Sequence, residues 1–167
     1  MNEFEKPFRM NVGIALFNAA GHVLIAHRRK DDGPEMIEPG HDWQMPQGGI
    51  DPNEDPQPAA IRELYEETGV KSVSYLGETG WFDYDWPPYS GPPHRLQAWR
   101  GQRQKWFAMR FTGDESEIDV VTPRIDDEPE FDIWRWEPLA NTPKLIVPFK
   151  RSIYENVAAA FAKFASG

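Results

Sequence analysis

The stretch GGIDPNEDPQPAAIRELYEETGV, residues 48–70, decides how the centre of this chain folds. Asp55 followed by Pro56 is typical of a helix start, and Gly69 is typical of a helix end, because glycine tolerates the left-handed backbone that closes a helix. We therefore expect a helix over residues 56–68. The two glycines that open the stretch supply flexible backbone just ahead of this helix.

Three glutamates share one side of the expected helix. At about 100° per residue, Glu63, Glu66 and Glu67 fall within one arc. The other side is expected to be the core face and consists of Ile61, Leu64, Tyr65 and Thr68. Like charges three or four positions apart are neighbours and repel, so the cluster either raises a carboxyl pKa or recruits a cation. The alternative to a cation site is a solvated acidic face on a surface helix, because most runs of charged residues simply face the solvent.

Composition limits the kind of metal that this cluster can bind. The 167 residues are 40% hydrophobic and 13% aromatic, which predicts one globular domain over residues 1–167. The absence of cysteine excludes disulfides and thiolate metal sites. The fitting cations are therefore hard ones, Mg²⁺ or Mn²⁺, which prefer carboxylate and water oxygens.

The charge balance argues against a basic binding surface. The net charge is 18 − 27 = −9, whereas non-specific nucleic-acid or membrane binding needs clustered Lys and Arg. The chain has no apolar run long enough to span a membrane, and its start lacks a signal-peptide pattern. A cytoplasmic location is expected.

Alternation and turn residues predict several strands around the central helix. Expected strands cover residues 12–17, 22–28, 43–45, 73–78, 104–111 and 131–136. Residues 29–41 and 83–101 are rich in Pro and Gly and are expected to be loops. An amphipathic helix is expected over residues 149–164. Strands with two separated helices imply an α/β domain in which a mixed sheet is covered on both faces.

The spacing within residues 48–70 resembles the signature of the Nudix hydrolases. Gly48 is followed after five residues by Glu54, and after seven more by Arg62-Glu63-Leu64-x-Glu66-Glu67-x-Gly69-Val70. The resemblance implies an α/β/α sandwich with a mixed β-sheet. It also implies Mg²⁺-dependent hydrolysis of a nucleoside diphosphate linked to a variable group, with Mn²⁺ or another divalent cation able to substitute.

The resemblance gives roles to residues of the signature. Glu63, Glu66 and Glu67 are implied metal ligands, with the backbone carbonyl near Gly48 completing the site. Arg62 and Glu54 are implied to orient the loop and the helix by hydrogen bonding. Glu63 and Glu66 are both candidates for the base that accepts the proton of the attacking water.

The flanking segments resemble the bacterial RNA 5′-pyrophosphohydrolases and the related dinucleoside polyphosphate hydrolases. The matching segments are Arg9-x-Asn11-Val12-Gly13, Trp43-Gln44-x-Pro46-Gln47-Gly48-Gly49, Gly101-Gln102-x-Gln104-Lys105-Trp106-Phe107, Pro129-Glu130-Phe131-Asp132-x-Trp134-Arg135-Trp136 and Phe149-Lys150-Arg151. By this similarity Glu130 adds a further carboxylate to the metal site; the alternative is an exposed loop glutamate.

The same similarity suggests substrate-binding residues. The candidates for holding phosphates are Arg9, Arg28, Lys105 and Lys150, although each alone fits a surface salt bridge equally well. Phe149 resembles a residue that stacks a base, and a core position is the competing interpretation. Tyr84, Gln47 and Asn11 are further candidates at the nucleotide. The loop at residues 30–40 is longer than in the short enterobacterial-type enzymes, and Met10 replaces a usual proline.

The sequence therefore predicts an Mg²⁺-dependent pyrophosphohydrolase that converts the 5′-triphosphate end of RNA to a 5′-monophosphate. The closest alternative is asymmetric cleavage of diadenosine tetraphosphate to ATP and AMP, and both activities can coexist in one enzyme. A remote alternative is a module that binds nucleotide without hydrolysing it. The expected partner is the nucleotide substrate, with no membrane and no obligate protein partner, and a monomer is expected.

Overall fold

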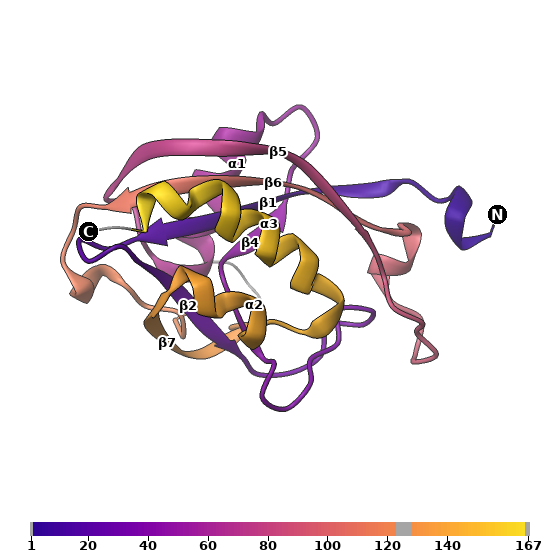
Figure 1. The fold of residues 1–167 in the computed structure, drawn as a ribbon. Coiled ribbons are helices and arrows are strands. Elements are labelled where there is room, and N and C mark those ends of the chain that lie inside the picture. The colour runs from indigo at the N-terminus through magenta and orange to yellow at the C-terminus, as the bar shows by residue number, and fades with distance from the viewer. Residues whose placement is uncertain (1, 123–127, 166–167) are drawn as a thin grey trace.

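The computed structural model describes residues 2–122 and 128–165 (Figure 1). The strands are β1 (Phe8–Phe17), β2 (His22–Arg28), β3 (Trp43–Gln44), β4 (Gln47–Gly49), β5 (Val73–Asp85), β6 (Gly101–Phe111) and β7 (Phe131–Pro138). The α-helices are α1 (Pro56–Thr68), α2 (Thr142–Leu145) and α3 (Arg151–Phe161). The predicted bounds of β2 and α1 are confirmed. β1, β5, β6 and β7 are longer than predicted, and β4 forms where flexible backbone was expected.

The seven strands form one mixed sheet. Its order is β3-β2-β1-β6-β5, with β4 paired to β1 and β7 paired to β2. The long β1–β6 pair is parallel, and the other pairs are antiparallel. β1 and β2 pair only at Phe17↔Val23, so the sheet opens beyond that hairpin, and β4 lies against β1 in the opening, with Val12 opposite Gly48.

Helices cover both faces of the sheet, which confirms the predicted sandwich. One core joins α1 to the even-numbered positions of β1, with Ile14 packed near Leu64. The other core joins α3 to the odd-numbered positions, with Phe17 and Ala15 near Val157. Figure 1 shows α3 lying across one face of the strands. No helix in the described part of the chain is long and apolar enough to cross a membrane.

Helix α1 is rotated relative to the prediction. Its buried residues are Ala59, Ala60, Leu64 and Thr68. The expected core position of Ile61 is wrong, because that side chain is 44% exposed. At about 100° per residue, Glu63 and Glu67 fall in the arc between Ala59 and Ala60, so these glutamates face the protein rather than the solvent. The small alanines let the helix lie close to β1 and carry the carboxylates inward.

The two ends of α1 have different geometries. Gly69 has φ 77° and donates its N–H to the Tyr65 carbonyl, as expected of a left-handed helix end. Asp55 precedes the helix, but its side chain makes no capping hydrogen bond. The expected terminal helix begins at Arg151, after a 3₁₀ turn over Pro148–Lys150, and continues into a second 3₁₀ turn over Ala162–Phe164.

Candidate active site

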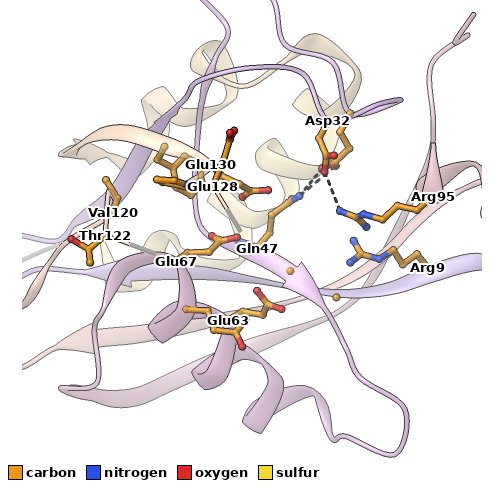
Figure 2. A pocket seen from close by; sticks show the side chains of 16 residues that line it. Arg9, Asp32, Gln47, Glu63, Glu67, Arg95, Val120, Thr122, Glu128 and Glu130 are labelled. Carbon is orange, nitrogen blue, oxygen red and sulfur yellow. Dashed lines mark hydrogen bonds and ion pairs between the residues drawn. The ribbon is translucent and has the colours of Figure 1, made fainter. Parts of the chain in front are cut away.

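A cavity of about 240 Å³ lies between α1, β4 and the segment that leads into β7. The predicted site residues that line it are Arg9, Gln47, Gly48, Glu63, Glu66, Glu67 and Glu130. Figure 2 shows Glu67 and Gln47 between Glu63 on one side and Glu130 on the other. The structure therefore brings all five predicted metal-site residues to one cleft, although they come from three separate parts of the sequence.

Gly48 is in close contact with the Glu63 carboxylate. A Cβ atom built on Gly48 would lie 1.9 Å from Glu63 Cδ, so any side chain at this position would displace the Glu63 carboxylate. The absence of a side chain therefore lets the backbone of β4 and the first glutamate of the cluster occupy adjacent positions. Glu67 is tied to the same strand, because its Oε2 accepts the backbone N–H of Gln47 at 3.2 Å.

Arg62 links the glutamate cluster of α1 to Glu54 and to the backbone of β4. Its guanidinium donates to both carboxylate oxygens of Glu54 at 2.8 and 2.9 Å and to the Gly49 carbonyl at 2.8 Å. Its Nη1 also lies 2.9 Å from Glu63 Oε1 and 3.1 Å from Glu66 Oε2. These contacts fit the orienting role that the sequence suggested for Arg62 and Glu54.

The electrostatics of the cleft disfavour the ionised forms of Glu63 and Glu67. Burial, opposed by Arg62 and reinforced by repulsion from Glu66, raises the pKa of Glu63 to about 7. Burial and the negative charges of Glu130 and Glu63 raise the pKa of Glu67 well above its ordinary value. A divalent cation would relieve this repulsion, and an all-oxygen donor set suits Mg²⁺.

The carboxylates are not already arranged around a common point. Within residues 2–122 and 128–165, no three His, Cys, Asp or Glu side chains form a ready metal-binding group. Arg62 Nη1 lies between Glu63 and Glu66 and supplies the positive charge there. The all-oxygen donor chemistry therefore fits a hard cation, which would take over the charge neutralisation that Arg62 supplies to Glu63 and Glu66.

Three of the predicted substrate residues lie in a buried polar network behind the cleft. Asn11 is fully buried, Tyr84 is 7% exposed and Lys150 is 1% exposed. The Lys150 ammonium lies 2.7 Å from Glu35 Oε1, and Phe149 packs beside Tyr84 with ring centroids 5.9 Å apart. Lys150 therefore does not present its charge to the cleft, where the sequence suggested a phosphate ligand.

Arg28 and Lys105 also occupy places other than the cleft wall. Arg28 is 5% exposed and donates to the Glu35 carbonyl at 2.8 Å. Lys105 pairs with Glu78 at 2.8 Å, above the Trp81 ring. Of the four cations suggested for phosphates, the structure places only Arg9 on the cavity wall.

Sequence reasoning missed three residues of this region, Glu35, Gln102 and Gln104. Gln104 donates to Asn11 and to Gln47, each at 2.9 Å, and Gln102 accepts from Arg9 at 2.8 Å. The two glutamines stand in a matching flanking segment, which was a usable signal. Glu35 lies in a loop whose only signal was its length.

Comparison with known proteins identifies the family. The Nudix domain family matches residues 7–157. The chain belongs to the Nudix family. It is 54% identical over 160 residues to a protein named RNA pyrophosphohydrolase from Rhodopseudomonas palustris, covering 95% of this chain and 90% of that protein. It is 51% identical over 170 residues to a protein of the same name from Caulobacter vibrioides, covering 100% of this chain and 94% of that one.

Solved structures of other Nudix proteins share the fold. A MutT protein from Methanosarcina mazei superposes with a TM-score of 0.62 at 16% identity, covering 93% of this chain and 96% of that one. An Ap4A hydrolase from C. elegans superposes with a TM-score of 0.57 at 18% identity, covering 92% and 98%. At these identities the likeness concerns the fold, and it agrees with the sandwich described above.

Proposed function

We propose that this Nudix chain is a divalent-cation-dependent RNA pyrophosphohydrolase that converts a 5′-triphosphate end to a 5′-monophosphate. The observation that carries the proposal is the near-full-length similarity to RNA pyrophosphohydrolases at 54% and 51% identity. The cleft supports it with a cluster of glutamates on the inward side of α1, facing β4.

Glu63, Glu66 and Glu67 would hold the cation, with Glu130 and the carbonyl near Gly48 in reach of the same cleft. When bound, a divalent cation neutralises phosphate charge and lowers the pKa of the attacking water. Mg²⁺ is the preferred candidate, and Mn²⁺ can substitute.

The chain's own groups then position the substrate and accept a proton. Arg9 presents a guanidinium on the cavity wall, where it can bind a phosphate oxygen. Glu63 or Glu66 accepts the proton of the water that attacks phosphorus, and the P–O bond to the leaving pyrophosphate breaks. Arg62 keeps both carboxylates aimed at the cleft through its bonds to Glu54 and Gly49.

Steady-state kinetics with two substrates test this function. With Mg²⁺, we expect the protein to release pyrophosphate or successive phosphates from triphosphorylated RNA, and to have a higher kcat/KM for it than for diadenosine tetraphosphate. Loss of all turnover in EDTA is the expected control. A large preference for the dinucleotide would favour the alternative hydrolase, and no hydrolysis of either substrate would exclude the enzyme.

Glu66→Gln and Glu67→Gln test the assignment of the glutamates. Each variant keeps the side-chain volume and loses a charged metal ligand, so we expect a drop in turnover of about 10²-fold or more. Circular dichroism checks that the fold is kept, and Glu155→Gln on the exposed side of α3 is the matched control. Wild-type turnover in either variant would contradict the metal assignment. A cytoplasmic location and a monomeric state are part of the same proposal.

A further inference from the structure

Glu35 is a charged side chain that the preceding mechanism does not use. It is 7% exposed and comes from the loop between β2 and β3. Burial opposes ionisation of this carboxyl, but the Lys150 ammonium and the Arg28 guanidinium outweigh it and lower the pKa of Glu35 to about 2. The group is therefore an anion that only accepts hydrogen bonds.

Four donors from distant parts of the chain converge on this carboxylate. Lys150 Nζ lies at 2.7 Å, the Tyr84 hydroxyl at 3.0 Å and Gln102 Nε2 at 3.1 Å from Glu35 Oε1. Gln47 Nε2 lies 3.3 Å from Oε2. Each of the four residues is buried, so the carboxylate is held by buried groups at the inner wall of the cavity, which Glu35 also lines.

The acceptor-only anion sets the orientation of the two amides. Because Gln102 turns its Nε2 to Glu35, its Oε1 faces the other way and accepts from Arg9 Nη1 at 2.8 Å and from Asn11 Nδ2 at 2.9 Å. Arg9 is one of two arginines on the cavity wall, the other being Arg95. Glu35 thus reaches Arg9 through one glutamine.

A second chain of hydrogen bonds leads from Glu35 through Gln47 toward the glutamate cluster. Gln47 turns its Nε2 to Glu35, which leaves its Oε1 to accept from Gln104 at 2.9 Å. The backbone N–H of the same Gln47 donates to Glu67 at 3.2 Å. Lys150 follows Phe149, so the ion pair also anchors the ring that packs against Tyr84.

The loop holds Glu35 in place before any substrate arrives. Asp32 and Glu35 exchange two backbone hydrogen bonds, at 3.0 and 3.2 Å. His94 accepts the Leu96 N–H on Nδ1, so its Nε2 carries the proton that it donates to Asp32 at 2.9 Å. Gly33, with φ +57°, lies directly against the His94 ring, where a Cβ would approach within 2.3 Å.

We propose that Glu35 is a positioning residue for substrate binding, through which the long loop after β2 fixes Arg9, Tyr84 and the Phe149–Lys150 pair. The inference rests on the proposed function and adds a residue that affects substrate binding but lies outside the glutamate cluster. Its physical basis is that several donors share one buried, ionised acceptor, and a buried polar network is rigid only while every member is satisfied.

Glu35→Gln removes the charge but keeps the side-chain size. The amide oxygen can still accept from Lys150, Tyr84 and Gln102 in place of Oε1, but the NH2 group then faces Gln47 Nε2, donor against donor, and the charge that held all four donors is lost. For a fluorescent RNA oligonucleotide that carries a non-hydrolysable 5′-triphosphate analogue, measured with Mg²⁺ present, we expect anisotropy to show a Kd raised about tenfold, which corresponds to the loss of one hydrogen bond to a charged group. With Mg²⁺ we expect KM to rise by a similar factor while kcat changes less than about threefold.

Glu38→Gln is the matched control, because Glu38 is an exposed glutamate of the same loop. We expect its Kd, KM and kcat to equal those of the wild type. A folded Glu35→Gln variant that binds the RNA within about twofold of the wild type, or that loses kcat without a change in KM, would overturn the inference. Failure of the wild type itself to hydrolyse the RNA would instead count against the proposed function.

A second pair of variants covers the case in which Glu35→Gln does not fold, since it leaves the buried Lys150 charge without a partner. Glu35→Gln/Lys150→Met removes both charges and is compared with Lys150→Met alone. We expect the double variant to bind the RNA about fivefold more weakly than the single one, because the amides of Gln47 and Gln102 lose their common acceptor. Equal affinities of the double and the single variant would show that the Glu35–Lys150 ion pair only stabilises the fold.

Discussion

Glu67 carries its carboxylate on the side of α1 that faces the protein. Its pKa is raised by burial and by the charges of Glu130 and Glu63. A carboxyl whose pKa is higher in the folded than in the unfolded state destabilises the fold at any pH above the folded value. The buried glutamates of the site therefore lower the stability of the metal-free protein, and the same arrangement of charges suits a cation.

Glu67→Gln should consequently stabilise the metal-free protein. In EDTA at pH 8 we expect its thermal midpoint to exceed that of the wild type by about 2 °C, which corresponds to about 0.5 to 1 kcal/mol in a chain of this size. With Mg²⁺ the order should reverse, because ligand binding to the folded state stabilises only the protein that binds it. A midpoint for the variant below the wild type in EDTA would contradict the repulsion argument.

Gly48→Ala tests the contact between β4 and the helix. The added methyl would overlap the Glu63 carboxylate, so Glu63 must move out of the cleft. We expect turnover of triphosphorylated RNA to fall about 10²-fold, as small displacements in an active site often do. Gly80→Ala is the matched control, because a Cβ there meets nothing within 4 Å, and it should keep wild-type turnover.

At the scale of elements, His27 joins three segments at the edge of the opened sheet. It stands on β2, and its ring nitrogens lie 2.8 Å from Asp42, just before β3, and 2.8 Å from Asp132 on β7. Burial opposes protonation of this imidazole, but the hydrogen bonds to Asp132 and Asp42 outweigh it and raise the pKa of His27. The protonated ring therefore clamps β2 to its neighbours.

His27→Gln should destabilise the protein in a pH-dependent way. Because the folded pKa lies above the unfolded one, the stabilisation is fully present below the unfolded pKa of about 6.5 and is lost as pH rises through the folded value. We expect the difference in unfolding free energy between wild type and variant to be about 1 kcal/mol larger at pH 5.5 than at pH 9. Urea unfolding measures it, with His22→Gln on the same strand as control; a difference that is constant with pH would contradict the clamp.

At the scale of the whole molecule, the proposed function requires an acidic protein to bind a polyanion. The net charge is −9. Arg95 on the cavity wall is paired with Asp32, and two further arginines, Arg103 and Arg100, are paired with Asp83 and Asp85. An acidic balance of this size, with these arginines already paired, disfavours an extended basic track for an RNA backbone over residues 2–122 and 128–165. Recognition should therefore concentrate on the 5′ end, where a cation and Arg9 offset the repulsion.

Substrate length tests this expectation. We expect KM for a triphosphorylated trinucleotide to lie within about threefold of that for a 20-nucleotide RNA with the same 5′ sequence, since additional phosphates find few cations to displace their counterions. Both RNAs are unstructured and are compared at low and moderate salt. A KM for the longer RNA that is lower by about tenfold or more, with a steep salt dependence, would show a basic contact surface instead.

Particular residues show how far the sequence could predict the structure. The ends of α1 followed from local signals, and Gly69 has the left-handed backbone that its position predicted. The core face of the same helix did not follow, because the exposed position of Ile61 depends on how closely Ala59 and Ala60 let the helix approach β1. Helical spacing places side chains relative to one another, whereas the sheet decides which of them turn inward.

By itself the sequence determined the Nudix family, the mixed sandwich and the glutamate cluster on α1, because these depend on spacing within short segments and on hydrophobic periodicity. Only the tertiary structure decided that Lys150 and Arg28 are enclosed, that Arg9 stands on the cavity wall, and that Glu35 joins them. The reason is physical: Glu35 meets Gln102 and Lys150 across long separations in sequence. Such contacts form only when strand pairing and burial bring their segments together, and no local pattern records them.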